Sequence, residues 1–152
     1  MRVAIGADHR GYELKEQLIG SLKRQGHAVT DLGTHSIDPV DYPDYAAAVA
    51  DAVASGRADR GIVVCGSGAG AAIAANKIRG IRAVQCSDTY TAAQSVEHDD
   101  ANVIAIGALV VGDAVADELA THFLDAEFTG EERHLRRLEK VKALEDRYQA
   151  AE

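Results

Sequence analysis

The sequence predicts an α/β fold with a doubly wound, five-stranded parallel sheet. Two observations carry this prediction: five short apolar runs alternate with segments of helical periodicity, and polar or glycine-rich residues follow the apolar runs. Ligands of such sheets bind outside the carboxyl ends of the strands, where these polar residues would lie. A length of 152 residues is enough for one hydrophobic core, so we expect residues 1–152 to form a single domain.

The expected strands are short, apolar and bounded by turn residues. They lie at residues 3–6, 28–32, 61–65, 83–86 and 103–106. Between and after them, apolar residues three and four positions apart predict helices at 12–25, 45–55, 69–78, 89–97 and 113–124. Because helical crossovers connect parallel strands, the alternation predicts a flavodoxin-like, Rossmann-like three-layer sandwich.

A further, C-terminal helix is expected at about residues 131–149, with an apolar stripe on one face. The stripe consists of Leu135, Leu138, Val141, Leu144 and Tyr148. An apolar stripe of this length needs a packing partner. Two partners are possible: the sheet of the same chain, or a second subunit in a dimer.

The first turn of this last helix is crowded with basic residues. They are Arg133, His134, Arg136 and Arg137. Cations at a helix N-terminus oppose the helix dipole. A placement that the helix itself does not favour indicates a binding site for an anion.

Composition restricts the class of partner. The 16 basic and 24 acidic residues give a formal charge of −8, which argues against binding to nucleic acid or to a membrane surface. The chain begins in a strand, without a signal-peptide pattern, so we expect a cytoplasmic protein. Cys65 and Cys86 each end an apolar run, so they are expected near one another at one edge of the sheet, as free thiols.

The segment 61–80 carries the strongest chemical signal. An apolar strand ends at Cys65 and turns through Gly66, Gly68 and Gly70 into a helix. Without Cβ atoms, the backbone N–H groups of this turn can converge on an anion at the helix N-terminus. The same partial positive charge favours a thiolate at Cys65. A base beside an oxyanion cradle is typical of proton-transfer and acyl-transfer enzymes.

Other interpretations of this loop can be compared with the sequence. A P-loop requires Lys and then Ser or Thr after its last glycine, and a thiol phosphatase requires an arginine six residues after its cysteine; Ala71 stands at both places. A dinucleotide-binding turn, with Asp88 on the ribose, is only weakly supported by the glycine pattern. A further interpretation is a tight turn that only buries an unreactive cysteine.

Several segments in order resemble one family. They are GADHRG at 6–11, DYPDYA at 41–46, GIVVCGSGAG at 61–70, IAANKIRGIRA at 73–83 and EHDDAN at 97–102. These motifs are similar to those of ribose-5-phosphate isomerases of the B type, which belong with the galactose-6-phosphate isomerase subunits. The resemblance implies an aldose–ketose isomerase that works through an enediolate without cofactor or metal. It also implies a homodimer with shared active sites, and leaves a tetramer open.

The resemblance also implies roles for individual residues. Cys65 would be the base between C1 and C2 of the sugar, because the glutamate that some members use is replaced here by Ala71. Ser67 would move the hydroxyl proton, and the loop with Gly66, Gly68 and Gly70 would stabilise the oxyanion. His98, with Asp8, would open the sugar ring. The phosphate would be bound by His9, Arg133 and Arg137, and Tyr42 would line the sugar pocket.

Two positions depart from the family pattern and concern the substrate. Asp99 stands where the family usually has asparagine, and an ionised carboxylate can only accept hydrogen bonds. Leu109 stands where an arginine is common and would assist the phosphate. Ribose 5-phosphate is therefore the expected substrate, and another aldose phosphate or a free rare aldose is the alternative. A non-catalytic nucleotide-binding module, using the glycine loop and Asp88, is the alternative from a different class.

Overall fold

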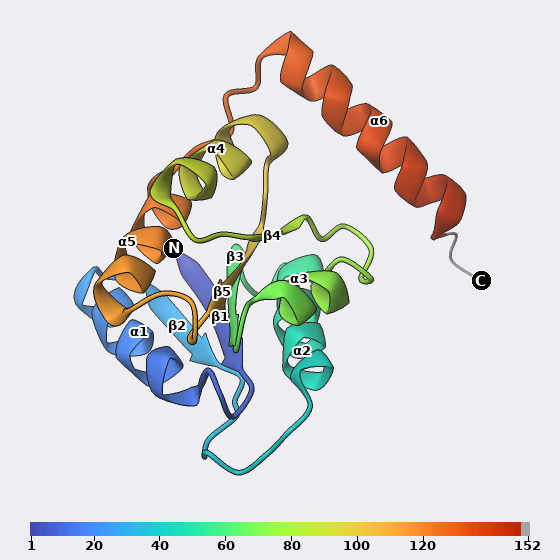
Figure 1. Ribbon diagram of the computed structural model, residues 1–152. Coiled ribbons are helices and arrows are strands. Elements are labelled where there is room, and N and C mark those ends of the chain that lie inside the picture. Colours follow the sequence, from blue (N-terminus) through green and yellow to red (C-terminus); the bar gives the residue numbers. More distant parts are fainter. Residues whose placement is uncertain (150–152) are drawn as a thin grey trace.

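The computed structural model describes residues 1–149 and consists of a parallel sheet between two layers of helices, with a last helix outside them (Figure 1). The strands are β1 (Arg2–Ala7), β2 (Ala28–Asp31), β3 (Arg60–Cys65), β4 (Ala83–Gln85) and β5 (Val103–Gly107). The helices are α1 (Tyr12–Arg24), α2 (Tyr42–Ala54), α3 (Ala69–Ala75), α4 (Thr89–Asp99), α5 (Asp113–Asp125) and α6 (Glu132–Tyr148). Every expected element is confirmed, and within the described residues no helix is long and apolar enough to cross a membrane.

Helix α2 begins three residues earlier than its apolar pattern predicts. Asp41 is the extended residue before the helix, and Pro43 lies in the first turn, where its missing N–H leaves no hydrogen bond unmade. Tyr42 therefore stands on the first turn of a helix, at a fixed place beside the carboxyl edge of the sheet.

The sheet has the strand order β2-β1-β3-β5-β4, with all strands parallel. The predicted fold class is confirmed, and the last two strands are exchanged relative to the flavodoxin order 2-1-3-4-5. Strand β5 thus separates β3 from β4. Cys65 packs in the core on one face of the sheet and Cys86 in the core on the other, so the expectation that they are neighbours is wrong.

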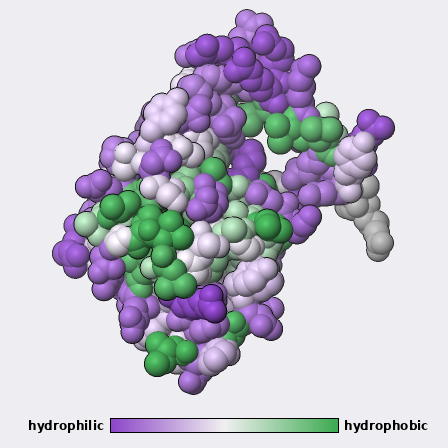
Figure 2. Space-filling view, in the orientation of Figure 1, coloured by the Kyte–Doolittle hydropathy of each residue, from purple (hydrophilic) through white to green (hydrophobic). Residues whose placement is uncertain are grey.

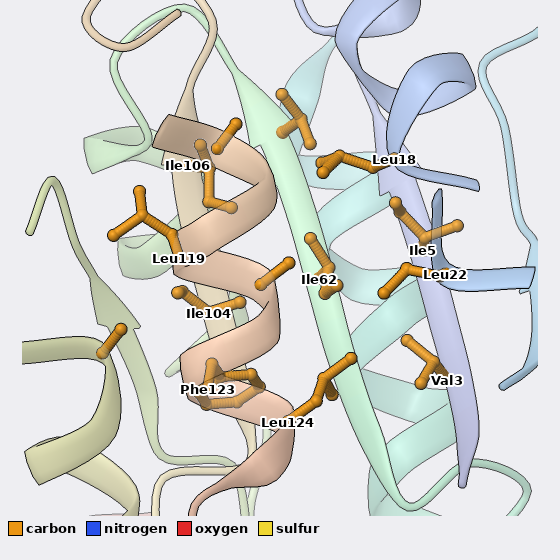
Figure 3. Packing of buried hydrophobic residues seen from close by; sticks show 14 of the residues in the cluster. Val3, Ile5, Leu18, Leu22, Ile62, Ile104, Ile106, Leu119, Phe123 and Leu124 are labelled. Carbon is orange, nitrogen blue, oxygen red and sulfur yellow. The ribbon is translucent and has the colours of Figure 1, made fainter. Parts of the chain in front are cut away.

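The two faces of the sheet are packed differently. Helices α1, α4 and α5 cover one face with large residues, and Figure 3 shows Leu18, Leu22, Leu119 and Phe123 against the isoleucines of the strands. The other face carries the alanine-rich α2 and α3. Small residues let this layer approach closely: a Cβ on Gly61 would lie only 2.5 Å from Val49.

Helix α6 does not pack on the sheet of its own chain (Figure 1). Its beginning lies against α4, and near its end Glu145 accepts a hydrogen bond of 2.7 Å from the Gly80 N–H. Between these two attachments, a groove of about 540 Å³ separates Val141, Leu144 and Tyr148 from the edge strand β4. Figure 2 shows hydrophobic residues on the side of α6 that faces the body, and Tyr148 is 72% exposed. The apolar stripe is therefore uncovered in the single chain.

A buried ion pair joins α1 to the end of β2. The side chain of Lys15 is fully buried, and its Nζ lies 2.8 Å from Asp31 and 2.7 Å from Glu16. Burial alone would raise the pKa of Asp31, but the hydrogen bonds from Lys15 and from the Gly33 N–H outweigh it, so the pKa is lowered. The pair fixes the start of the loop that follows β2.

Candidate active site

A cavity of about 550 Å³ opens at the carboxyl edge of the sheet, between the loops that follow β1 and β3 and the first turn of α2. This is an ordinary size for a small-molecule site. Its lining includes seven residues predicted from the sequence: Asp8, His9, Tyr42, Cys65, Gly66, Ser67 and Gly70. The sheet thus brings three separate segments of the chain to one place.

Cys65 is the last residue of β3, and its Sγ accepts a hydrogen bond of 3.1 Å from the Gly68 N–H. Gly68 can turn the chain here because it adopts φ = 84°, a conformation that other residues rarely reach. The N–H group stabilises negative charge on the sulfur. On the other face of the sheet, burial, with a smaller effect of Asp88, raises the pKa of the Cys86 thiol to about 11.

The other two glycines of the loop leave space for side chains. A Cβ on Gly70 would lie 2.6 Å from the ring of Tyr42, so only glycine lets this ring rest against the start of α3 and form a wall of the cavity. A Cβ on Gly66 would lie 3.3 Å from Cδ of Arg10. The glycine turn is thus left-handed at Gly68 and flanked by two positions of close approach.

Asp8 and His9 are held by the backbone around them. Oδ1 of Asp8 accepts hydrogen bonds of 3.0 Å from the N–H groups of Arg10 and Gly11, which fixes the loop into α1. Within residues 1–149, its Oδ2 has no protein hydrogen bond. Nδ1 of His9 accepts a hydrogen bond of 3.2 Å from the Val40 N–H, so the ring of neutral His9 carries its hydrogen on Nε2. The cavity therefore offers one carboxylate acceptor and one imidazole donor.

The remaining predicted residues form a second cluster, at the junction of α4 and α6. His98 lies in the last turn of α4, Asp99 ends this helix, and Arg133 and Arg137 lie in the first turns of α6. Arg133 pairs with Glu131 at 3.0 Å, whereas Arg137 has no ion pair within the part of the chain described here. All of these groups except the half-buried His98 are exposed.

The two clusters lie at opposite ends of the strands (Figure 1). The segment after α4 meets the beginning of β3, where the Gly61 N–H donates to the Asn102 carbonyl at 2.9 Å. The Cys65 carbonyl, at the other end of β3, accepts from Ala108. A strand of six residues spans roughly 17 Å. One chain therefore does not bring His98, Arg133 and Arg137 to the ligand that Cys65 would contact.

His134, which the sequence analysis counts among the basic residues of an anion site, is instead buried behind His98. Its side chain is 1% exposed, its ring stacks on His98 with the centroids 4.2 Å apart, and its Nδ1 lies 2.7 Å from the Thr129 hydroxyl. Burial, with the neighbouring His98 and Arg133, lowers the pKa of His134. His134 is thus a buried platform for the ring of His98. The signal in the sequence was its position four residues before Leu138, on the apolar side of the helix.

Asp88, the residue on which a nucleotide-binding interpretation depends, has a structural role. Its Oδ1 accepts a hydrogen bond of 2.7 Å from the Thr91 N–H, and its Oδ2 accepts one of 2.9 Å from the Thr91 hydroxyl. The carboxylate therefore caps α4. Both of its oxygens are occupied by the helix.

The fold and the cavity together define an α/β protein with a cysteine-lined cavity at the carboxyl edge of its sheet. The sequence model of the family described as Ribose/Galactose Isomerase matches residues 3–141, and the chain belongs to this family. Ribose-5-phosphate isomerase B of Escherichia coli (strain K12) is 46% identical over 96% of this chain and 97% of its own length.

Two further comparisons extend the similarity. D-erythrulose-4-phosphate isomerase of Pectobacterium atrosepticum is 44% identical, over 86% of each chain. The structure of Clostridium thermocellum ribose-5-phosphate isomerase B superposes with a TM-score of 0.95 at 49% identity, covering 97% of this chain and 99% of that one. The fold, over 97% of this chain, is therefore shared with that solved structure.

Proposed function

We propose that the protein is an aldose–ketose isomerase that interconverts ribose 5-phosphate and ribulose 5-phosphate through an enediolate. The observation that carries this proposal is the cavity in which Cys65, Ser67, Asp8 and His9 meet, in a chain of the ribose/galactose isomerase family. A thiolate, a hydroxyl and backbone N–H groups are the set of groups that moving a proton between adjacent carbons requires.

Cys65 is the base of the proposed reaction. Its thiolate takes the proton from C2 of the open-chain aldose, and the electron pair of the C–H bond forms the enediolate, with negative charge on O1. The same proton then returns from the thiol to C1, which yields the ketose. Backbone N–H groups at the start of α3 are the donors that we assign to this charge.

Ser67 is placed to move the hydroxyl proton between O2 and O1. Its Oγ accepts a hydrogen bond of 3.2 Å from the Ala69 N–H, so the hydroxyl proton itself is available to the substrate. Tyr42 bounds the sugar on the opposite wall, and the Nε2–H of His9 binds the phosphate. Each of these groups comes from the chain that supplies Cys65.

Ring opening and the rest of the phosphate site are proposed to come from a second subunit. His98, assisted by Asp8, opens the furanose, and Arg133 and Arg137 bind the phosphate in bidentate contacts. The support is the separation of the two clusters along β3 and the uncovered apolar stripe of α6. A homodimer with shared sites accounts for both, because the helix that carries the arginines would bury its stripe on the partner.

A second candidate substrate is a shorter or otherwise different aldose phosphate, or a free rare aldose. Leu109, which is 72% exposed and lies beside Gly66, provides no cation where the family commonly has an arginine, and Asp99 adds an anion to the second cluster. One relative is named D-erythrulose-4-phosphate isomerase. Steady-state kinetics on ribose 5-phosphate, a four-carbon aldose phosphate and free ribose decide between the two. The higher kcat/KM on the four-carbon substrate would establish the second candidate.

The nucleotide-binding alternative is less well supported, since Asp88 caps α4 and the glycine turn follows β3. Thermal-shift measurements with sugar phosphates and with nucleotides separate the two classes.

We also propose a cytoplasmic location, which suits an enzyme with two free thiols.

Replacing His98 by asparagine tests ring opening. We expect turnover of ribose 5-phosphate to fall by about a hundredfold or more, the usual contribution of a general acid–base group. A four-carbon aldose phosphate cannot close a furanose ring, so its turnover should change far less. His122→Asn, on the exposed side of α5, is the matched control and should leave both rates unchanged. Equal losses of His98→Asn on both substrates would contradict the role.

A further inference from the structure

Arg10 is the one basic residue of the cavity to which the proposed mechanism gives no role. It follows His9 in the loop after β1 and lines the cavity beside Cys65 and Ser67. Its backbone N–H is held by Asp8 at 3.0 Å. Its guanidinium forms neither an ion pair nor a side-chain hydrogen bond with any residue between 1 and 149. The positive charge is therefore free to bind a ligand.

The side chain of Arg10 extends over the loop that holds Cys65. A Cβ built on Gly66 would lie 3.3 Å from its Cδ and 3.5 Å from its Nη1. Leu109 also packs next to Gly66, with its Cδ1 3.6 Å from the position of that Cβ. Glycine at position 66 thus leaves space for the aliphatic part of the Arg10 side chain, and the guanidinium lies beside the backbone of the loop. The charge lies next to the residue that follows Cys65.

The other ionised groups of the cavity have the opposite sign. The lining contains Asp8, Asp41 and Asp44, and Arg10 is the only permanently cationic residue among the lining residues of the described chain. His9 offers a neutral N–H donor. Arg133 and Arg137 lie at the far end of the strands and reach this cavity only from a partner. An anionic substrate that enters the cavity therefore meets one fixed cation from the chain that carries Cys65.

We propose that Arg10 is a specificity-determining residue whose guanidinium binds an anionic oxygen of the substrate beside Gly66. This inference rests on the proposed sugar-phosphate chemistry of the same cavity. The oxygen belongs to the phosphate or to the enediolate, and a guanidinium binds either with charge-assisted hydrogen bonds. With leucine at position 109, Arg10 supplies the charge on this side of the cavity.

Kinetics of Arg10→Gln test the contact, with Arg57→Gln as the control because Arg57 is exposed near the amino end of β3. We expect kcat/KM on ribose 5-phosphate to fall by on the order of tenfold in Arg10→Gln, with a smaller loss in Arg10→Lys. A phosphate contact raises KM and the inhibition constant of inorganic phosphate, whereas an enediolate contact lowers kcat and leaves phosphate inhibition unchanged. Arg10→Gln kinetics equal to those of Arg57→Gln would overturn the proposal.

A second measurement does not depend on isomerase activity. Mass spectrometry follows the alkylation of Cys65 by anionic iodoacetate and by neutral iodoacetamide, with the slowly reacting Cys86 as an internal reference. A cation at Gly66 attracts iodoacetate, so Arg10→Gln should lower the ratio of the two rates severalfold relative to Arg57→Gln. An unchanged ratio would refute a charge at this place even if the sugar-phosphate assignment fails for other reasons.

Discussion

Replacement of Cys65 by alanine is expected to lower the turnover of ribose 5-phosphate by about a thousandfold or more, because a positioned base contributes about 10²–10⁴-fold. The thiolate acts in the chemical step and contributes little to affinity. The variant should therefore still bind a sugar phosphate. Steady-state kinetics give the loss of kcat, and calorimetry with ribose 5-phosphate gives the dissociation constant of the inactive protein.

Cys86→Ala is the matched control for this substitution. Cys86 is 1% exposed, its thiol has a pKa of about 11, and it packs on the other face of the sheet. Its loss removes a thiol from the core and leaves the cavity intact, so kcat should stay close to that of the unmodified protein. Near-normal turnover of Cys65→Ala would show that another group moves the proton.

The second large effect concerns stability. Asp31→Ala should lower the free energy of unfolding by about 2–3 kcal/mol, less than the roughly 3–5 kcal/mol of a fully buried pair, because Asp31 is 29% exposed and Glu16 still contacts the ammonium group. Lys15 has no exposed side-chain surface, and Asp31 provides two of the oxygen contacts of its ammonium group. Only Glu16, which is 47% exposed, would remain. Urea unfolding followed by circular dichroism measures the change.

The double variant Lys15→Met/Asp31→Ala is the control and should be more stable than Asp31→Ala alone, because it no longer buries an unpaired ammonium group. The pH dependence gives a further check. The pKa of Asp31 is lowered in the folded protein, so its stabilising contribution is present above about pH 4, the unfolded value, and is lost as the pH falls through the folded value. Asp31→Ala should lack this acid-dependent loss. A double variant less stable than Asp31→Ala would contradict this account.

The strands and helices could be predicted because each depends on local periodicity, but the order of the strands could not. The alternation of elements is the same whether β4 lies between β3 and β5 or at the edge of the sheet. Its three residues Ala83–Gln85 are too short to show whether both sides are paired. Pairing partners are set by packing between distant segments, which periodicity does not encode.

The candidate site, like the fold, could be predicted from the sequence only in part. The loop from Cys65 to Gly70 could be predicted because one contiguous segment contains both the turn and the thiol. The burial of His134 behind His98 could not, since it depends on the packing of α6 against α4. The placement of His98 and Cys65 at opposite ends of the sheet likewise follows only from the three-dimensional structure.

Activity of mixed dimers tests most directly that an isomerase site is completed by a second subunit. Cys65→Ala and Arg137→Ala chains, each expected to be strongly impaired alone at substrate concentrations well below KM, are mixed, and subunit exchange is verified by native mass spectrometry. Random exchange makes about half of the dimers hybrid, each with one intact site, so about a quarter of the activity on ribose 5-phosphate should return. If exchange is complete and no activity returns, each site is built from a single chain and the proposed dimeric site is wrong.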